Sequence, residues 1–114
     1  METVLIQLDA GKLKNPDLDI RYALPERIEE YTGGAVSDNG YDFINGHVLG
    51  IWLSAADAEQ AAEAVIRLLQ TETFLDNDLS SAAEVWISEE DSAAPEQCRK
   101  IYPAAGASRS DRSN

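Results

Sequence analysis

The sequence predicts an α+β domain of the ferredoxin-like, split βαβ type, in which an antiparallel sheet carries two helices on one face. Short aliphatic runs alternate with two stretches of helical periodicity in the order strand, helix, strand, strand, helix, strand. An Asn-Gly dipeptide joins the second and third strand runs, as in a tight hairpin. The length of 114 residues suits one domain with its own core.

The first strand is expected over residues 4–8, an aliphatic run followed by a turn at Gly11. The first helix is indicated by apolar residues at spacings of four, four and three, and Gly33 ends it. Pro25 leaves two alternatives, a helix that begins near Leu24 or two short helices that meet there. The apolar stripe consists of Ile20, Leu24, Ile28 and Tyr31.

The second and third strands are expected over residues 36–44 and 48–53. They flank Asn45-Gly46, the pair that a two-residue type I′ turn favours, so a hairpin is predicted here. Trp52 is expected in the core, because Leu49, Ile51 and Leu53 surround it in the sequence.

The second helix is indicated by an alanine-rich stretch that follows Ser54 and Asp57, which are spaced as in a capping box. Glu63 precedes Arg67 by one turn, the spacing of a stabilising ion pair. The residues predicted to face the core are Ala58, Ala61, Ala62, Val65, Leu68 and Leu69.

The last long strand alternates between two kinds of side chain. Ala83, Val85 and Ile87 form an aliphatic face, while Glu84 and Trp86 occupy the other. The sheet face opposite the helices is therefore expected to be open to solvent or to a partner.

Residues 99–102 form a possible short fifth strand. Residues 1–103 are predicted to form the single domain, and residues 104–114 are predicted to be a disordered tail.

Charge is the most uneven property of the chain. Its net charge is -12, and fifteen carboxylates but only one basic residue, Arg67, lie between Arg27 and Arg99. Such a surface attracts cationic partners and disfavours nucleic acid and anionic membranes. The alternative interpretation is that the charge only keeps the protein soluble.

Cytoplasmic localisation is expected. Cys98 is the only cysteine, which excludes an internal disulfide and fits a reducing compartment. No apolar stretch approaches the roughly twenty residues that a membrane-spanning helix needs, so no membrane association is expected.

Catalytic residues, cofactors and metal ions are not expected. His47 is the only histidine and neighbours the predicted hairpin turn, and Cys98 has no other histidine as a partner. Asp76-Asn77-Asp78 is similar to the start of a calcium loop, but Ser81 and Ile87 stand where an EF-hand requires Gly and Glu.

Binding of another protein is the function that remains after these exclusions. Aromatic side chains surrounded by charged ones contribute most of the binding energy at protein interfaces. Trp86 is the preferred aromatic candidate, since it shares a strand face with Glu84. The residues predicted to bind the partner are Asp38, Tyr41, Asp42, Asp76, Asp78, Glu84, Trp86, Glu89, Glu90 and Asp91.

A family resemblance agrees with this interpretation. The segments LIQLDA from Leu5, DNGYDF from Asp38, LGIWL from Leu49 and DNDLSSAAEVWIS from Asp76 resemble immunity proteins of bacterial contact-dependent and polymorphic toxin systems. The resemblance implies a non-enzymatic inhibitor that binds one cognate toxin domain, commonly a basic nuclease, in the cytoplasm. A monomer or weak homodimer that does not contact nucleic acid directly is expected.

Two alternatives stay open. The first is a small-ligand or metal-sensing regulatory domain, which requires a pocket lined by Tyr41, Trp86 and the turn from Asp76 to Asp78. The second is an acid/base enzyme, which requires two carboxylates in a cleft with pKa values pushed apart.

Overall fold

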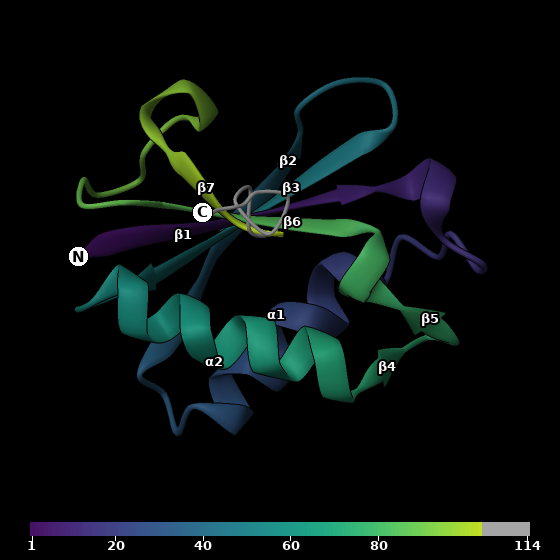
Figure 1. Ribbon diagram of the computed structural model, residues 1–114, viewed down its shortest axis with the longest axis horizontal. Helices are drawn as coiled ribbons and strands as arrows, with labels where there is room; N and C mark the ends of the chain where they lie inside the picture. The colour runs from purple at the N-terminus through teal and green to yellow at the C-terminus, as the bar shows by residue number, and fades with distance from the viewer. Residues whose placement is uncertain (104–114) are drawn as a thin grey trace, which may run out of the picture.

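Two helices lie against the same face of a five-stranded antiparallel sheet in the computed structural model, which describes residues 1–103 (Figure 1). The strand order is β2-β3-β1-β6-β7. The predicted α+β class, antiparallel sheet and pair of helices are therefore confirmed. The five-stranded order departs from a four-stranded ferredoxin-like sheet by its additional edge strand, and a separate two-stranded sheet follows the second helix. The predicted tail, residues 104–114, lies outside the described residues.

The bounds of the elements follow the predicted order with few shifts. The strands of the main sheet are β1 (Glu2–Asp9), β2 (Val36–Phe43), β3 (Val48–Ala55), β6 (Ala83–Ser88) and β7 (Arg99–Tyr102). The helices are α1 (Ile20–Tyr31) and α2 (Ala58–Thr71). The small sheet pairs β4 (Thr73–Phe74) with β5 (Asn77–Asp78), and short 3-10 turns are η1 (Ala10–Lys12), η2 (Leu79–Ser81) and η3 (Pro95–Gln97).

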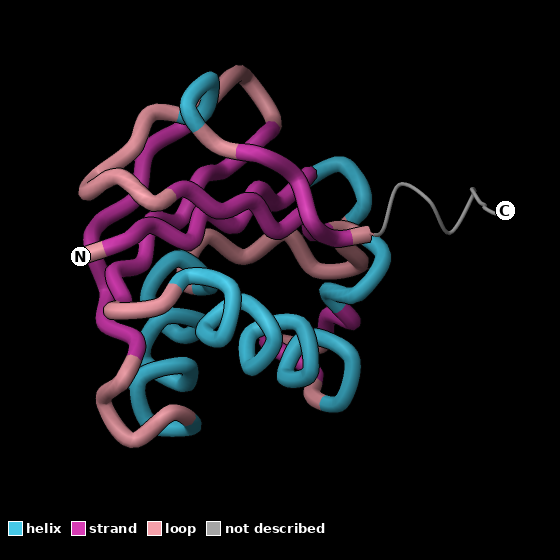
Figure 2. The backbone as a smooth tube through the Cα atoms, turned by 60° about the vertical axis from the view of Figure 1, so that its left-hand side comes forward, coloured by secondary structure: helices cyan, strands magenta, loops and turns pink. Residues whose placement is uncertain are grey.

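Both helices lie on one side of the sheet (Figure 2). The hydrophobic core consists of side chains from the sheet and from both helices. Val4, Ile6 and Leu8 of β1 point into it, because alternate residues of a strand face the same side. All six residues of the predicted inner stripe of α2 are buried there, which confirms that interpretation.

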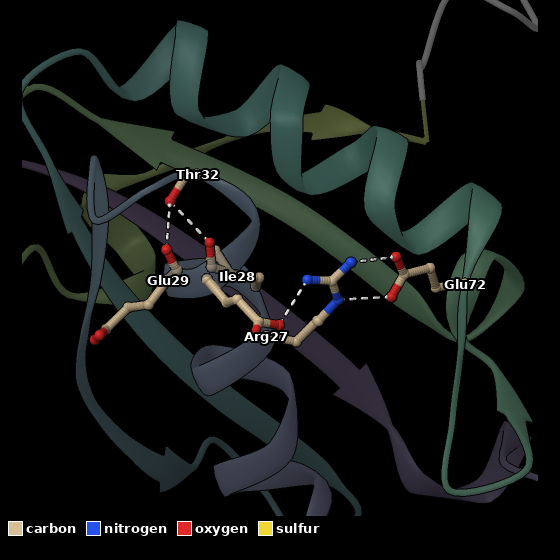
Figure 3. A network of polar contacts seen from close by, with 6 residues as sticks. Arg27, Ile28, Glu29, Thr32 and Glu72 are labelled. Atoms are coloured by element: carbon tan, nitrogen blue, oxygen red, sulfur yellow. Dashed lines mark hydrogen bonds and ion pairs between the residues drawn. The ribbon is translucent and has the colours of Figure 1, made fainter.

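Helix α1 is one continuous helix, so both alternatives drawn from Pro25 were wrong. Pro25 is buried in its interior beside Leu24, and Ile20 and Ile28 are also buried. Proline cannot donate the usual hydrogen bond at this position, so apolar contact offsets the loss. At its end the Thr32 hydroxyl donates to the carbonyl oxygen of Ile28 at 2.8 Å (Figure 3).

An arginine joins the two helices. The Arg27 guanidinium donates from Nε and Nη2 to the two oxygens of Glu72 at 2.9 and 2.7 Å, and from Nη1 to Glu30 at 2.7 Å (Figure 3). This fork geometry fixes the first residue after α2 against the middle of α1. The predicted pair of Glu63 with Arg67 is not among the ion pairs of residues 1–103.

The hairpin between β2 and β3 is confirmed, but its turn type was wrong. Its loop spans residues 44–47, and the Asn45 carboxamide oxygen accepts hydrogen bonds from the amides of His47 and Val48 at 3.1 Å each. Gly46 does not adopt the positive φ that a type I′ turn requires. The side chain of Asn45 therefore shapes the loop in place of a glycine conformation.

The cap of α2 also differs from the prediction. Asp57 is the N-cap residue, and its carboxylate accepts a hydrogen bond from the Gln60 amide at 3.2 Å. Ser54 belongs to β3 instead. An aspartate alone satisfies one free amide of the first turn, so the helix begins without the full capping box.

The sheet face opposite the helices, called the outer face below, is partly covered by the chain itself. Leu5 lies between Trp52 and Trp86 in the register of the central strands and is fully buried. The connection from β6 to β7 folds over this row, where the Trp52 indole donates to the Ala93 carbonyl oxygen at 2.8 Å. Trp52 is therefore on the outer face, and its expected place in the core between the sheet and the helices was wrong.

We expect Leu5→Ala to lower the free energy of unfolding by about 2–5 kcal/mol, because the truncation leaves a cavity between two indoles. Urea denaturation measures this change. The control is Leu18→Ala, at a side chain that is 48% exposed, which is expected to cost less than about 0.5 kcal/mol. Equal costs at the two positions would contradict a second core on the outer face.

We also expect the Arg27–Glu72 pair to make the stability of the folded state depend on pH. Arg27 lowers the pKa of Glu72, so the pair stabilises the folded state at neutral pH and its contribution is lost as the pH falls through that lowered pKa. Glu72→Gln should therefore lower the melting temperature at pH 7 and change it less as the pH falls through that lowered pKa. The exposed Glu63→Gln is the control, and an effect of Glu72→Gln that is independent of pH would exclude this origin.

Candidate functional site

The ten predicted partner-binding residues fall into separate groups. Asp38, Tyr41 and Asp42 lie on the edge strand β2, and Glu84 and Trp86 lie on the outer face of β6. The other five lie in two connections at opposite ends of the molecule (Figure 1). They are Asp76 and Asp78 in the β4–β5 hairpin, and Glu89, Glu90 and Asp91 after β6.

The largest exposed aromatic group lies where α1 runs beside β2. Tyr22 is 53% exposed, Tyr41 is 42% exposed, and their rings meet edge to face with centroids 5.9 Å apart. Phe43, two residues further along β2, is 48% exposed. Exposed aromatic side chains in one place mark interaction surfaces more often than isolated ones do.

Carboxylates border these rings. Glu26 and Glu29 of α1 line a shallow hollow of about 270 Å³ together with Tyr22 and Asp38. We call this surface the α1–β2 flank, formed by Tyr22, Glu26, Glu29, Asp38, Tyr41 and Phe43. It combines apolar anchors with negative charge, whereas the outer face presents mainly half-buried indoles.

Arg21 is the cation of this region, and the aromatic rings engage it. Its guanidinium carbon lies 4.6 Å from the Tyr22 ring centre and 5.1 Å from that of Tyr41. Its Nε is shielded from water and has no hydrogen-bond acceptor among residues 1–103. The guanidinium stacks on both rings and helps to hold the two tyrosines in place.

The two tyrosines have pKa values that move in opposite directions. The neighbouring Tyr41 hydroxyl, followed by Arg21, lowers the pKa of Tyr22. The Tyr22 hydroxyl in turn raises the pKa of Tyr41. The ionisation of each tyrosine therefore depends on its neighbour.

Glu84 and Trp86 make contacts within the sheet. The Trp86 indole donates to the Glu84 carboxylate at 3.0 Å, and Lys100 of β7 lies 3.7 Å from the other oxygen of Glu84. These contacts occupy the carboxylate and partly bury the ring. The predicted pair thus lies together as expected, but on a surface where β7 already supplies a cation.

The acids after β6 lie in a segment that is tied to the body of the protein. The Glu90 carbonyl oxygen accepts from the Thr3 hydroxyl at 2.7 Å, and Ser92 accepts from the Asn39 carboxamide at 3.2 Å. The second contact joins this segment to the bend of β2, and Asp91 is the residue that precedes Ser92. Of these three acids, Asp91 is thus the one whose neighbour in the sequence contacts β2.

Asp76 and Asp78 are remote from that region. Asp76 and Leu75 form the tip of the β4–β5 hairpin with φ values of 68° and 51°. The buried Asn77 holds this tip, since its carboxamide donates to the Asn15 carbonyl oxygen at 2.6 Å and accepts from the Asn15 amide at 2.7 Å. Asp78 caps η2 through Ser80, which lowers the pKa of its carboxyl group. Asp78 therefore acts locally in this turn, while Asp76 is exposed at its tip.

An apolar cleft lies between the end of α1 and the start of α2. It has a volume of about 310 Å³, and five of its lining residues are alanines, Ala35, Ala55, Ala56, Ala61 and Ala64. Tyr31 and Gln60 also line it. This is not the pocket expected for a sensor, because Tyr41 and Trp86 point to opposite sides of the sheet.

The residues considered for catalysis are apart from one another. Cys98 lies before β7, and burial and then Glu96 raise the pKa of its thiol, which disfavours the reactive thiolate. His47 lies in the β2–β3 loop, where its carbonyl oxygen accepts from the Ala10 amide. Among residues 1–103, no three His, Cys, Asp or Glu side chains gather as metal ligands, and no helix there could span a membrane.

Sequence reasoning missed Tyr22, Glu26 and Glu29 as members of a surface. Their spacing of four and three residues places them on one face of α1, so the pattern was present. The pattern did not indicate which strand lies beside that face of α1. That strand is β2, and its position at the edge depends on how the whole sheet is arranged.

No family model, curated protein or solved structure matches this chain. The function is therefore inferred from the surface alone.

We expect Tyr41→Phe to raise the pKa of Tyr22 toward its ordinary value of 10.0, because the variant removes the neighbouring hydroxyl group that lowers this pKa but keeps the ring contact. Ultraviolet absorbance during a pH titration follows the ionisation of the phenols. Tyr31→Phe, on another side of α1, is the control. An unchanged titration of Tyr22 in Tyr41→Phe would show that the two hydroxyl groups are not linked.

Proposed function

We propose that this chain is an immunity-type protein that binds and neutralises a cognate cationic toxin domain, most simply a nuclease. The observation that carries the proposal is the α1–β2 flank, where the exposed Tyr22 lines a hollow with carboxylates of α1 and β2 and contacts the exposed Tyr41. Aromatic anchors with charge around them are the residues that dominate binding energy at protein interfaces.

The proposed mechanism is competition for the toxin's cationic active site. Carboxylates of the flank take the positions that substrate phosphates otherwise occupy, and Arg or Lys side chains of the toxin donate charge-assisted hydrogen bonds to them. The net charge of -12 accelerates encounter, while Tyr22, Tyr41 and Phe43 supply contact area. The inhibitor itself carries out no reaction.

The framework we propose is a ferredoxin-like split βαβ unit to which β7 and the β4–β5 hairpin have been added. The sequential pairing of β2 with β3, and of β1 with both β3 and β6, supports this relation. In this arrangement the β2 edge and α1 form one side of the domain, which leaves that side available to a cytoplasmic partner.

A regulatory module for a small ligand is the second candidate, and the apolar cleft of about 310 Å³ favours it. The cleft has few polar side chains with which to select a metabolite. Thermal stabilisation by small apolar compounds in the unaltered protein, but not in Ala64→Leu, would favour this candidate over toxin binding.

We expect Tyr22→Ala combined with Tyr41→Ala to weaken binding to the toxin domain encoded beside this gene by about 100-fold, since truncation of two anchors removes about 2–3 kcal/mol or more. Calorimetry measures the affinity. Tyr31→Ala is the matched control, at a tyrosine that is 38% exposed but lies on the Arg27 side of α1.

Salt provides the second part of this test. The association rate of the unaltered protein should fall steeply as ionic strength rises, because exposed charges are screened. A rate that is insensitive to salt removes the electrostatic part of the proposal. Absence of binding removes the whole proposal, and equal losses in the double variant and in Tyr31→Ala remove the flank as the site.

A further inference from the structure

Strand β2 is an edge strand whose outward main chain is exposed. It ends the order β2-β3-β1-β6-β7, and all of its residues from Asp38 to Phe43 are exposed. The Ile44 amide donates to the Val48 carbonyl oxygen at 2.8 Å, so by the alternation of antiparallel pairs the main-chain groups of Tyr41 and Phe43 point away from β3. An exposed edge of this kind is a template for pairing with another strand.

The protein's own carboxylates occupy this edge. The Asp38 amide donates to Glu29 at 2.9 Å, the Gly40 amide to Asp38 at 3.0 Å, and the Phe43 amide to Asp42 at 2.8 Å. We call Glu29, Asp38 and Asp42 the edge-capping carboxylates. Between residues 38 and 43 they accept hydrogen bonds from three amides that a neighbouring strand would otherwise use.

We infer that the edge-capping carboxylates close a latent interface between two copies of this chain, in which β2 would pair with β2. This inference goes beyond the proposed function and does not depend on it. The occupant is a second copy, because β2 is complementary to itself once its acids are removed. An antiparallel pair centred on residue 42 sets Tyr41 opposite Phe43 of the second copy, and aromatic cross-strand pairs are favourable.

Asp42 opposes that pairing in two ways. Its carboxylate already accepts the Phe43 amide, and in the centred pair it would stand directly opposite Asp42 of the second copy. Side chains that face each other across two strands are only about 4.5–5.5 Å apart at Cβ, where like charges repel. The bend of β2 between Asp38 and Tyr41, with Gly40 at a φ of 95°, also interrupts the outward row of donors.

These carboxylates therefore have a role that general acidity cannot replace. A net charge of -12 repels a second copy at low salt, but added salt screens that repulsion. The short hydrogen bonds from these carboxylates to amides of β2 are screened much less. The edge should stay closed in the unaltered protein at high ionic strength as well.

The test compares three double variants by sedimentation velocity, at about 0.15 M and about 1 M salt. Asp38→Ala with Asp42→Ala removes two caps and two charges. Asp38→Asn with Asp42→Asn removes the same charges but keeps oxygens that can accept the amides. Glu63→Ala with Glu96→Ala removes two charges from exposed positions that lie away from β2.

The alanine variant at positions 38 and 42 is expected to dimerise at least about tenfold more tightly than the other two variants at both salt concentrations. Amide exchange in that dimer should slow at Tyr41 and Phe43. Equal self-association of all three variants, or dimerisation of the unaltered protein at high salt, would show that charge alone keeps the copies apart. A monomeric alanine variant with a native circular dichroism spectrum would overturn the inference as well.

Discussion

The burial of β1 on both of its faces is the constraint on which the rest of the structure depends. Val4, Ile6 and Leu8 require helices on one side, and the fully buried Leu5 requires a cover on the other. The connection from β6 to β7 supplies that cover and draws Trp52 into it through Ala93. With both faces of the central strands engaged, the exposed aromatic side chains are left at the β2 edge, where the sheet ends.

Much of the fold could be predicted because periodicity reports which side chains share a face. The buried stripe of α2 and the alternation along β6 followed directly from it. Periodicity does not say what covers a face. The partial burial of Trp52 and Trp86 on the outer face could therefore not be predicted before the position of the connection over residues 89–98 was known. The type I′ turn at Asn45-Gly46 was wrong for a local reason, since Asn45 shapes its loop with its side chain. At the β4–β5 tip, Leu75 and Asp76 adopt the left-handed conformation without glycine, a feature that the sequence did not indicate.

The candidate site was only partly predictable, since charge and hydrogen bonding are separate properties of a carboxylate. Of the predicted acids, Asp78 caps a turn, Glu84 binds an indole, and Asp38 and Asp42 cap amides. A count of acids in the sequence treats them as equal. The contacts of these carboxylates show that several of them also stabilise turns and strands. The exposed tyrosines distinguish the α1–β2 flank from the remaining acidic surface.

The capped edge has a consequence for how this surface would meet a partner. A free carboxylate on a mobile side chain must be immobilised on binding, and that loss of conformational freedom weakens the complex. Asp38 and Asp42 each have one oxygen anchored to the main chain, so the other oxygen points in a set direction before any partner arrives. The β2 side of the domain is thus a pre-organised array of oriented acceptors, which favours selectivity for one arrangement of cations over attraction to positive charge in general.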